Sequence, residues 1–330
     1  MSYNTYDCID AGTENCPCYL ALTGDCLTCS RLQGKDCCDC NWRGVCIYNE
    51  FVQGNRKVNN PRTEFEAKIL EKKFYLDDLV IFILDVGKGF AIKASHPGSY
   101  VFLRGRQSSH FYDLPISVMR ADVEKGTIHV AVKIIALKTK ALLEEPERFV
   151  LRGVYRNGIQ GVSALRPSKT KDQKILFIAK GIGVAPAILA ANALRYRNKV
   201  DFVLDTEKIS TELISDYLGE KGNHEVKEIN EENGAVGELG IIKYLTLNNE
   251  QDRRDLVRLL KKENYDCVAV LASDYFVDTI GALVRKTLPG VKLANSNNFH
   301  ICCGEGVCGA CSFVNEEGDT IRMCKCQRRE

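Results

Sequence analysis

The sequence carries no excess of charge of either sign and no long uninterrupted apolar run. Its 330 residues include 45 Lys and Arg against 43 Asp and Glu, which leaves a formal net charge of +2. A basic surface that would hold a phosphate backbone is therefore not expected, and we predict no nucleic-acid partner. The most apolar stretch, Ile175 to Leu194, is interrupted by a lysine, two glycines and a proline and is barely as long as a membrane span. We expect no membrane insertion.

Two further absences narrow the function. The first residues, MSYNTYDCID, contain no charged segment followed by an apolar core, so we expect no signal peptide and a cytoplasmic location. No Ser/His/Asp or Cys/His arrangement and no motif with paired carboxylates indicates a nucleophilic or general acid–base site. Internal repeats and low-complexity segments are also missing, and the length favours two or three domains.

Cysteine is the residue that the sequence has in excess. Of the 16 cysteines, nine lie between Cys8 and Cys46 and six between Cys302 and Cys326, while Cys267 stands alone in an apolar segment that predicts a buried strand. In an intracellular chain, thiols this close in sequence more often bind metal or carry out redox chemistry than form structural disulfides. The long segment between the two groups should form a conventional scaffold.

The scaffold changes character near residue 172. Residues 62–168 contain short β-branched and aromatic runs separated by turns, which predict an antiparallel barrel or sandwich. Residues 172–295 alternate apolar strands with helical segments, which predicts an open parallel α/β sheet. We therefore expect a Cys-rich module over 1–52, an all-β domain, an α/β domain and a C-terminal Cys-rich loop over 296–330.

The C-terminal loop carries the most specific motif. Its spacing is Cys303-x4-Cys308-x2-Cys311-x12-Cys324, and four thiolates with this spacing match the plant-ferredoxin type of [2Fe–2S] ligation. Glycines between the cysteines allow the backbone to fold closely around a cluster. A zinc site is the alternative, although zinc ribbons usually carry two separated Cys-x2-Cys pairs. Cys326 is an alternative fourth ligand to Cys324.

Together with the order of the domains, this loop resembles that of the electron-transfer subunit of class 1B dihydroorotate dehydrogenase and of the small subunit of NADH-dependent ferredoxin:NADP oxidoreductase. Both families are ferredoxin-reductase-like. The resemblance covers residues 62–328 and leaves out the Cys-rich N-terminus. It implies a flavin-binding β-barrel, a nicotinamide-binding α/β domain, a [2Fe–2S] loop and a catalytic or electron-accepting partner subunit in a hetero-oligomer.

The family's flavin motifs are present in altered form. Pro97-Gly98-Ser99-Tyr100 matches its barrel turn, and Leu114 replaces the arginine of its flavin strand. The family's Gly-x-Gly-Thr-x-x-Leu motif appears without its glycines over 136–142, and we expect Arg156 to offset the charge lost at Leu114. The resemblance implies FAD contacts on three segments, at Pro115, Ile116, Ser117, Thr139, Gly153, Asn157 and Gly158. A barrel without flavin is the alternative.

The family's nicotinamide motif follows the strand at 175–179. The resemblance implies that Gly181, Gly183 and Pro186 approach the dinucleotide phosphates at the start of a helix. Lys180 stands where the family usually has another glycine, and Ser273-Asp274 replaces its Gly-Pro turn. A retained domain that no longer binds nucleotide is the alternative.

The N-terminal module contains no histidine, so any metal site there would be all-thiolate. Soft sulfur ligands select zinc or iron–sulfur clusters, and a segment with so few apolar residues needs such a centre to become ordered. Iron–sulfur clusters, zinc and free or redox-active thiols all stay open. The candidate ligands are Cys16, Cys18, Cys26, Cys29, Cys38, Cys40 and Cys46.

The predicted function is electron transfer between NAD(P)H, FAD and a [2Fe–2S] cluster, to or from a partner protein. The alternative is a non-catalytic scaffold or redox-sensing subunit that kept the fold and lost nucleotide turnover.

Overall fold

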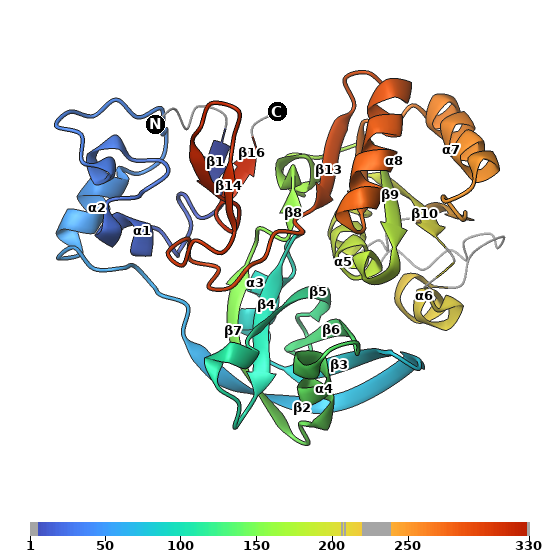
Figure 1. Ribbon diagram of the computed structural model, residues 1–330, viewed down its shortest axis with the longest axis horizontal. Helices are drawn as coiled ribbons and strands as arrows, with labels where there is room; N and C mark the ends of the chain where they lie inside the picture. The colour runs from blue at the N-terminus through green and yellow to red at the C-terminus, as the bar shows by residue number, and fades with distance from the viewer. Residues whose placement is uncertain (1–5, 206, 208, 220–238, 329–330) are drawn as a thin grey trace, which may run out of the picture.

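The computed structural model describes residues 6–205, 207, 209–219 and 239–328. Figure 1 shows a small N-terminal module, a β-barrel and an α/β domain, with the C-terminal segment running back to the module. The predicted fold class, a barrel followed by a parallel α/β domain with Cys-rich regions at both ends, is confirmed. No helix within the described ranges is long and apolar enough to cross a membrane.

The N-terminal module has little regular structure. It contains strand β1 (Tyr6–Cys8), helices α1 (Tyr19–Thr23) and α2 (Ile47–Gln53) and the 3₁₀ turn η1 (Ser30–Gln33). Cysteines form much of its small core, which consists of Cys16, Ala21, Cys26, Cys29, Leu32, Ile47 and Phe51. So few aliphatic side chains bury little apolar surface, which limits how much the module can stabilise itself.

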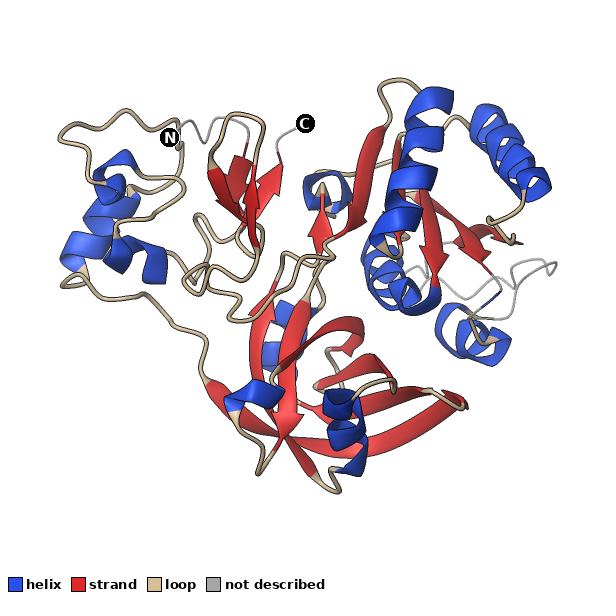
Figure 2. Ribbon diagram, viewed as in Figure 1, coloured by secondary structure: helices blue, strands red, loops and turns tan. Residues whose placement is uncertain are grey.

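The barrel closes from six antiparallel strands in the order β2-β3-β6-β5-β4-β7. Figure 2 shows these strands below the other parts of the molecule. Their bounds are β2 (Glu64–Leu76), β3 (Leu79–Asp85), β4 (Tyr100–Gly105), β5 (Leu114–Asp122), β6 (Thr127–Lys133) and β7 (Arg148–Tyr155). Short helical segments connect them: α3 (Lys88–Ala94), η2 (His110–Tyr112) and α4 (Leu137–Glu144).

The α/β domain is built on one sheet with the order β11-β10-β9-β12-β13-β8. The first five strands are parallel, and β8 pairs antiparallel with β13. The strands are β8 (Ile159–Gln160), β9 (Lys174–Lys180), β10 (Lys199–Asp205), β11 (Leu239–Tyr244), β12 (Cys267–Leu271) and β13 (Lys292–Ser296). Thus 159–160, inside the predicted β-domain range, contributes a strand to the α/β sheet.

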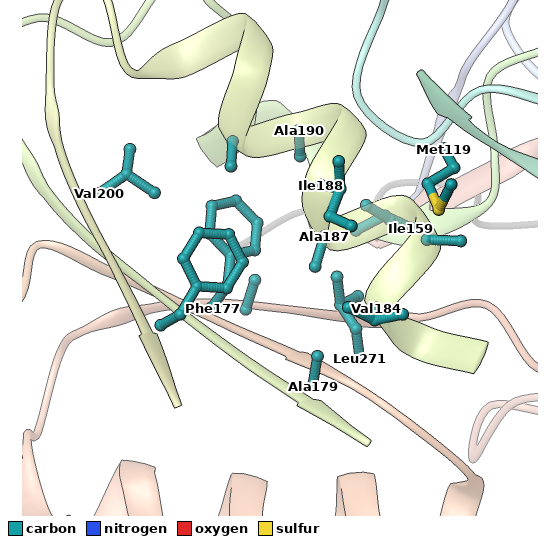
Figure 3. Close-up of a cluster of buried hydrophobic side chains, with 14 of the residues drawn as sticks. Met119, Ile159, Phe177, Ala179, Val184, Ala187, Ile188, Ala190, Val200 and Leu271 are labelled. Atoms are coloured by element: carbon teal, nitrogen blue, oxygen red, sulfur yellow. The ribbon is translucent and has the colours of Figure 1, made fainter. Parts of the chain in front are cut away.

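Helices cover both faces of this sheet. They are α5 (Val184–Leu194), α6 (Thr211–Leu218), α7 (Glu250–Glu263) and α8 (Asp274–Thr287), with the 3₁₀ turns η3 (Val162–Leu165) and η4 (Gly181–Gly183). Figure 3 shows α5 between the sheet and the barrel, where Met119 of β5 and Ile159 of β8 lie beside Ile188. One apolar core therefore joins the two domains.

The C-terminal segment returns to the N-terminus. It forms the hairpin β14 (Ser312–Val314) and β15 (Thr320–Arg322) and then strand β16 (Cys326–Arg328). Strand β16 pairs antiparallel with β1, which places Cys8 opposite Cys326. The two Cys-rich ends of the chain thus lie side by side (Figure 1).

Candidate redox centre at the C-terminal cysteine loop

The loop between β13 and β14 folds tightly because glycine stands where other residues would clash. Gly304 has φ +73°, and a Cβ atom there would lie 2.5 Å from the Tyr155 ring. Gly306 has φ +80° and lies against Leu20 of the N-terminal module. Both positions combine a left-handed backbone with close packing, which only glycine tolerates. The loop is thereby wrapped between the barrel and the N-terminal module.

Four thiols of the loop form a continuous series of side-chain contacts in space. The thiol of Cys303 interacts with those of Cys308 and Cys324, and Cys324 in turn contacts Cys311. The contact with Cys324 lowers the pKa of Cys303 to about 4 and that of Cys311 to about 6, against the opposing effect of burial. The same contacts raise the pKa of Cys324, and burial raises that of Cys308. The fold therefore brings together the four cysteines that the spacing singled out.

Backbone amides point at two of these sulfurs. The Glu305 amide donates to Cys303 Sγ at 3.3 Å, and the Cys324 amide donates to Cys311 Sγ at 3.3 Å. Hydrogen bonds to thiolate sulfur stabilise its negative charge, whether the sulfur is free or bound to a metal. The loop is thus prepared for thiolate ligation.

The other two C-terminal cysteines lie differently. Cys326 is fully buried on β16, and burial raises the pKa of its thiol to about 12. Cys302 is exposed. The contacts of Cys324 with Cys303 and Cys311 favour Cys324 over Cys326 as the fourth ligand.

A buried four-charge network holds the loop against the N-terminal module. Lys325 Nζ lies 2.6 Å from Asp10 Oδ2 and 2.9 Å from Glu305 Oε2, and Arg62 pairs with the same two carboxylates at 2.8 Å and 3.3 Å. Burial alone would raise the pKa of Asp10, but Lys325 and Arg62 lower it to about 2. Two cations therefore neutralise two anions from three distant segments.

Aromatic side chains of the barrel line the same loop. Tyr155 stacks on Tyr100 at 5.2 Å between ring centroids, and its hydroxyl donates to Glu305 Oε1 at 3.0 Å. The Tyr100 hydroxyl is buried without a hydrogen-bond partner. Burial is the main cause that raises the pKa of this phenol, and the nearby Cys324 thiol raises it further. A buried hydroxyl left unpaired is costly, and a sulfur acceptor beside Cys324 would satisfy it. The sequence does not single out the Tyr100 hydroxyl, because only the structure shows that it is buried near Cys324 without a hydrogen-bond partner.

Three residues of the predicted flavin set make internal contacts. Asn157 is fully buried and donates through Nδ2 to the carbonyls of Met323 at 2.6 Å and Cys326 at 3.0 Å. A Cβ atom at Gly153 would lie 3.1 Å from Val101, and one at Gly158 would lie 2.8 Å from the Gly98 carbonyl. Asn157 thus links the barrel region to the C-terminal segment. Gly153 and Gly158 allow close packing against Val101 and Gly98.

The other predicted flavin residues lie at the barrel surface. On β5, Pro115 is exposed, while Ile116 and Ser117 are half-buried. The Thr139 hydroxyl accepts from the Ile135 and Ala136 amides at 3.1 Å each and so begins helix α4. Strand β5 thus keeps an accessible apolar surface.

Arg156, expected to replace the family's lost arginine, points elsewhere. It pairs with Glu14 of the N-terminal module at 3.6 Å. It also lines a cavity of about 1250 Å³ between this module, the barrel and the segment after η3. Three other cationic residues, Lys35, Arg43 and Arg166, line that cavity as well. Pro115, Ser117 and Thr139 do not line this cavity.

The predicted nucleotide loop connects β9 to α5. Gly181 has φ +57° with open space around it, whereas a Cβ atom at Gly183 would lie 2.0 Å from the Leu271 carbonyl. Gly183 thus lets the helix pack on β12, and Pro186 lies buried in the first turn of α5. Lys180 Nζ pairs with the buried Asp205 at 3.0 Å and with Glu207 at 2.8 Å. The lysine in the family's glycine position therefore neutralises the acidic end of β10.

The N-terminal cysteines form two groups. Cys8, Cys16, Cys18 and Cys26 line one small cavity, although Cys8 was not among the predicted ligands. The Cys29 amide donates to Cys26 Sγ at 3.4 Å, and the sulfurs of Cys38 and Cys40 lie 3.7 Å apart near the surface. Cys37 and Cys46 are exposed.

Cys267 is fully buried on β12, as its apolar surroundings predicted.

No family model matches the chain. Its sequence is similar to the electron transfer subunit of dihydroorotate dehydrogenase B (NAD(+)) from Streptococcus pneumoniae, with 24% identity over 243 residues, 73% of this chain and 88% of that protein. A second strain's subunit matches at the same identity over 86% of its length. The predicted resemblance is confirmed by this match.

Two solved structures share the fold. The NADH-dependent reduced ferredoxin-NADP oxidoreductase aligns with a TM-score of 0.54 and 20% identity, over 78% of this chain and 85% of its own. Phthalate dioxygenase reductase, described as a modular structure for electron transfer from pyridine nucleotides to [2Fe-2S], aligns with a TM-score of 0.50 and 12% identity, over 81% and 96%. The chain therefore has the ferredoxin-reductase-like architecture.

Proposed function

We propose that this chain is a cytoplasmic electron-transfer oxidoreductase subunit that holds a [2Fe–2S] cluster on Cys303, Cys308, Cys311 and Cys324. The observation that carries the proposal is the C-terminal loop, where these four thiols contact one another beside amide donors. The reductase-like barrel and α/β domain supply surfaces for FAD and NAD(P)H. Since similar proteins are named as subunits, we include a partner protein that accepts or supplies the electrons.

The arrangement of the sulfurs favours two irons over one zinc. A tetrahedral zinc site with bonds of 2.3 Å would place every pair of sulfurs about 3.8 Å apart. Within the described ranges, the one group of three ligand atoms within 4.8 Å of one another is Glu64, His110 and Asp113, which contains no cysteine. The four C-terminal thiols instead form an open chain of contacts, which suits an elongated two-iron cluster.

The protein's own residues set the environment of the cluster. When bound, FAD accepts two electrons from NAD(P)H and releases them singly, and the [2Fe–2S] cluster carries one at a time. The amides of Glu305 and Cys324 donate to cluster ligands, and the Tyr100 hydroxyl lies unpaired beside Cys324. Tyr100, Tyr155 and Phe102 shield this side from water, since all three are almost completely buried. Hydrogen bonds and burial of this kind tune a cluster's reduction potential.

The barrel fits FAD in part. Pro115, Ile116 and Ser117 leave an accessible apolar surface on β5 that a flavin ring can cover. The phosphate contacts of the family are weaker here, because Leu114 replaces an arginine and the Thr139 hydroxyl already begins α4. We therefore propose that the flavin ring covers β5, with Lys138 and Lys140 of α4 as candidate cationic side chains for its phosphates.

A direct experiment separates these assignments. Protein purified without oxygen is assayed for iron, zinc, sulfide and flavin, and its visible spectrum is recorded before and after NADH. We expect a flavin, a [2Fe–2S] spectrum and bleaching of both by NADH. Cys308→Ser should lose the cluster spectrum, whereas Cys302→Ser, at an exposed neighbouring thiol, should keep it. Zinc in place of iron in the wild type, or an unchanged spectrum in Cys308→Ser, would contradict the cluster assignment.

One observation favours a second candidate, a scaffold or redox-sensing subunit without nucleotide turnover. Lys180 brings its ammonium group into the nucleotide loop and pairs with Asp205 and Glu207, where the family has a glycine that lets the dinucleotide approach. Calorimetric titration with NADH and with NADPH distinguishes the two candidates. Binding heat together with bleaching supports the NAD(P)H-dependent subunit. An intact cluster with neither response supports the second candidate, and electrons would then enter from the partner.

A further inference from the structure

We infer that the N-terminal module holds an iron–sulfur cluster of its own, bound by Cys8, Cys16, Cys18 and Cys26. The site is separate from the C-terminal loop and requires neither flavin nor nicotinamide. It selects four ligands from nine nearby cysteines, and it includes Cys8, which the spacing of the motifs did not single out.

The four side chains surround one cavity. It lies between the turn after β1, helix α1 and the turn at 26–28, and its lining contains these four cysteines with apolar residues such as Leu20 and Ile47. Cys18 lies within electrostatic range of Cys8, Cys16 and Cys26. Thiols from three separate segments therefore converge on one enclosed, largely apolar space.

The surroundings suit an anionic cluster. The buried ammonium of Lys325 lies within electrostatic range of Cys18 and Cys8. The Asp10 carboxylate, which pairs with Lys325 and also lines the cavity, offsets part of this positive charge. The Cys29 amide donates to Cys26 Sγ at 3.4 Å, and Cys16 accepts a backbone hydrogen bond from the Gly12 turn. Amide donors and a nearby cation stabilise thiolates and the sulfide-bridged clusters that they bind.

The spacing of the sulfurs favours a cluster over zinc here too. No three cysteine sulfurs in the described part of the chain lie within 4.8 Å of one another, whereas a tetrahedral zinc site needs all four about 3.8 Å apart. Soft thiolates without histidine or carboxylate ligands otherwise suit zinc and iron–sulfur clusters alike. The absence of such a compact group is consistent with a multi-iron centre.

The remaining cysteines do not join this set. Cys29 is buried and its amide donates to Cys26 Sγ; its thiol lies within electrostatic range of both Cys26 and Cys40, but Cys29 does not line the cavity. Cys38 and Cys40 contact each other near the surface, and Cys37 and Cys46 are exposed. The sequence alone could not make this division, because the Cys-x2-Cys spacing of Cys26 and Cys29 looks like a ligand pair.

The proposed site lies directly beside the C-terminal loop. Cys8 pairs with Cys326 across β1 and β16, and the Ile9 amide donates to the Lys325 carbonyl at 2.9 Å. Opposed Cα atoms in such a pair lie about 5 Å apart, and Cys324 is two residues from Cys326. The two centres would thus be separated by little more than one pair of strands.

Two neighbouring buried cysteines provide a matched test. Cys26 and Cys29 are 8% and 4% exposed, so replacing either with serine carries a similar risk to folding. We expect wild-type protein purified without oxygen to contain more iron and sulfide than one [2Fe–2S] cluster requires. Cys26→Ser and Cys8→Ser should lose this excess, while Cys29→Ser and the exposed Cys46→Ser keep it.

The electron paramagnetic resonance spectrum of dithionite-reduced protein tells the two centres apart. Cys8→Ser should lose one signal and retain the C-terminal one, whereas Cys308→Ser should do the reverse. Retained C-terminal signal also shows that Cys8→Ser is folded. Zinc in place of the excess iron, no excess iron in the wild type, or equal loss in Cys26→Ser and Cys29→Ser would overturn the proposal, and none of these results depends on NADH or flavin.

Discussion

The two Cys-rich ends of the molecule are built in different ways. The C-terminal loop lies on an extensive scaffold, since Tyr100, Tyr155 and Asn157 of the barrel region hold it from one side. The N-terminal module has only a small core in which cysteines replace much of the usual aliphatic packing. We therefore expect the C-terminal loop to be positioned before it binds a cluster and the N-terminal module to depend on a metal centre for its order.

Removal of iron should have the largest effect, because it should change the protease susceptibility of the N-terminal module but not that of the barrel. After treatment of the protein with an iron chelator, we expect the N-terminal module to become susceptible to protease within residues 8–53, by at least about tenfold. The barrel and α/β domain should resist cleavage, because their cores contain no proposed ligand. Limited proteolysis with mass spectrometry measures both regions in one sample. Equal susceptibility of the barrel, or a fully resistant module, would contradict the difference.

The network that joins the two ends should give the next largest effect. Lys325→Met leaves Asp10 and Glu305 facing only one cation in a buried site, and loss of one partner of a buried pair costs about 3–5 kcal/mol. Lys35→Met, which removes the exposed Lys35–Asp39 pair, is the control and should leave stability unchanged. Denaturant unfolding of the protein with its metal centres in place measures both variants. A small effect of Lys325→Met would mean that the network does not stabilise the junction.

The comparison also shows where sequence reasoning succeeded. The barrel, the parallel sheet and the C-terminal ligand spacing could be predicted, because short strands, apolar runs and a local motif each have a sequence signature. Strand β2 was harder, since its mixed pattern EFEAKILEKKFYL leaves charged side chains on an exposed face. Cys8 was not among the predicted ligands, because spacing alone does not show that it lines the same cavity as Cys16, Cys18 and Cys26.

Residues that match a family motif in sequence can make different contacts in the structure from those that the motif implies. Asn157 and Gly158 fit the family's flavin stretch in sequence, yet one caps carbonyls of the C-terminal segment and the other permits close packing against Gly98. Arg156 pairs with the N-terminal module. Since this module lies outside the part of the chain that resembles the family, no comparison of motifs could have predicted that contact.

Low pH tests how much Asp10 stabilises the junction between the two Cys-rich ends. Its pKa is lowered from 3.8 to about 2 in the folded protein, so its stabilising contribution is complete above pH 3.8 and is lost as the pH falls through 2. A shift of this size corresponds to about 2 kcal/mol. Asp10→Asn should therefore flatten the pH dependence of the stability of protein that has not been treated with chelator, between pH 4 and 2. An unchanged slope in this variant would show that Asp10 is not held by Lys325 and Arg62.

The smallest expected effect tests the scaffolded end alone. Tyr100→Phe removes a buried hydroxyl that has no hydrogen-bond partner, so the apoprotein should keep or slightly gain stability, because an unsatisfied polar group disappears. The holoprotein should respond differently if this hydroxyl donates to a sulfur beside Cys324: its C-terminal centre should become harder to reduce, since a hydrogen bond that favoured the reduced state is gone. Tyr75→Phe, at an exposed hydroxyl that bonds Asp216 at 2.5 Å far from the loop, is the control and should leave the potential unchanged. Potentiometric titration followed by electron paramagnetic resonance reads out the C-terminal signal separately. A lower potential in Tyr100→Phe alone would show that the barrel tunes this centre as well as supporting it.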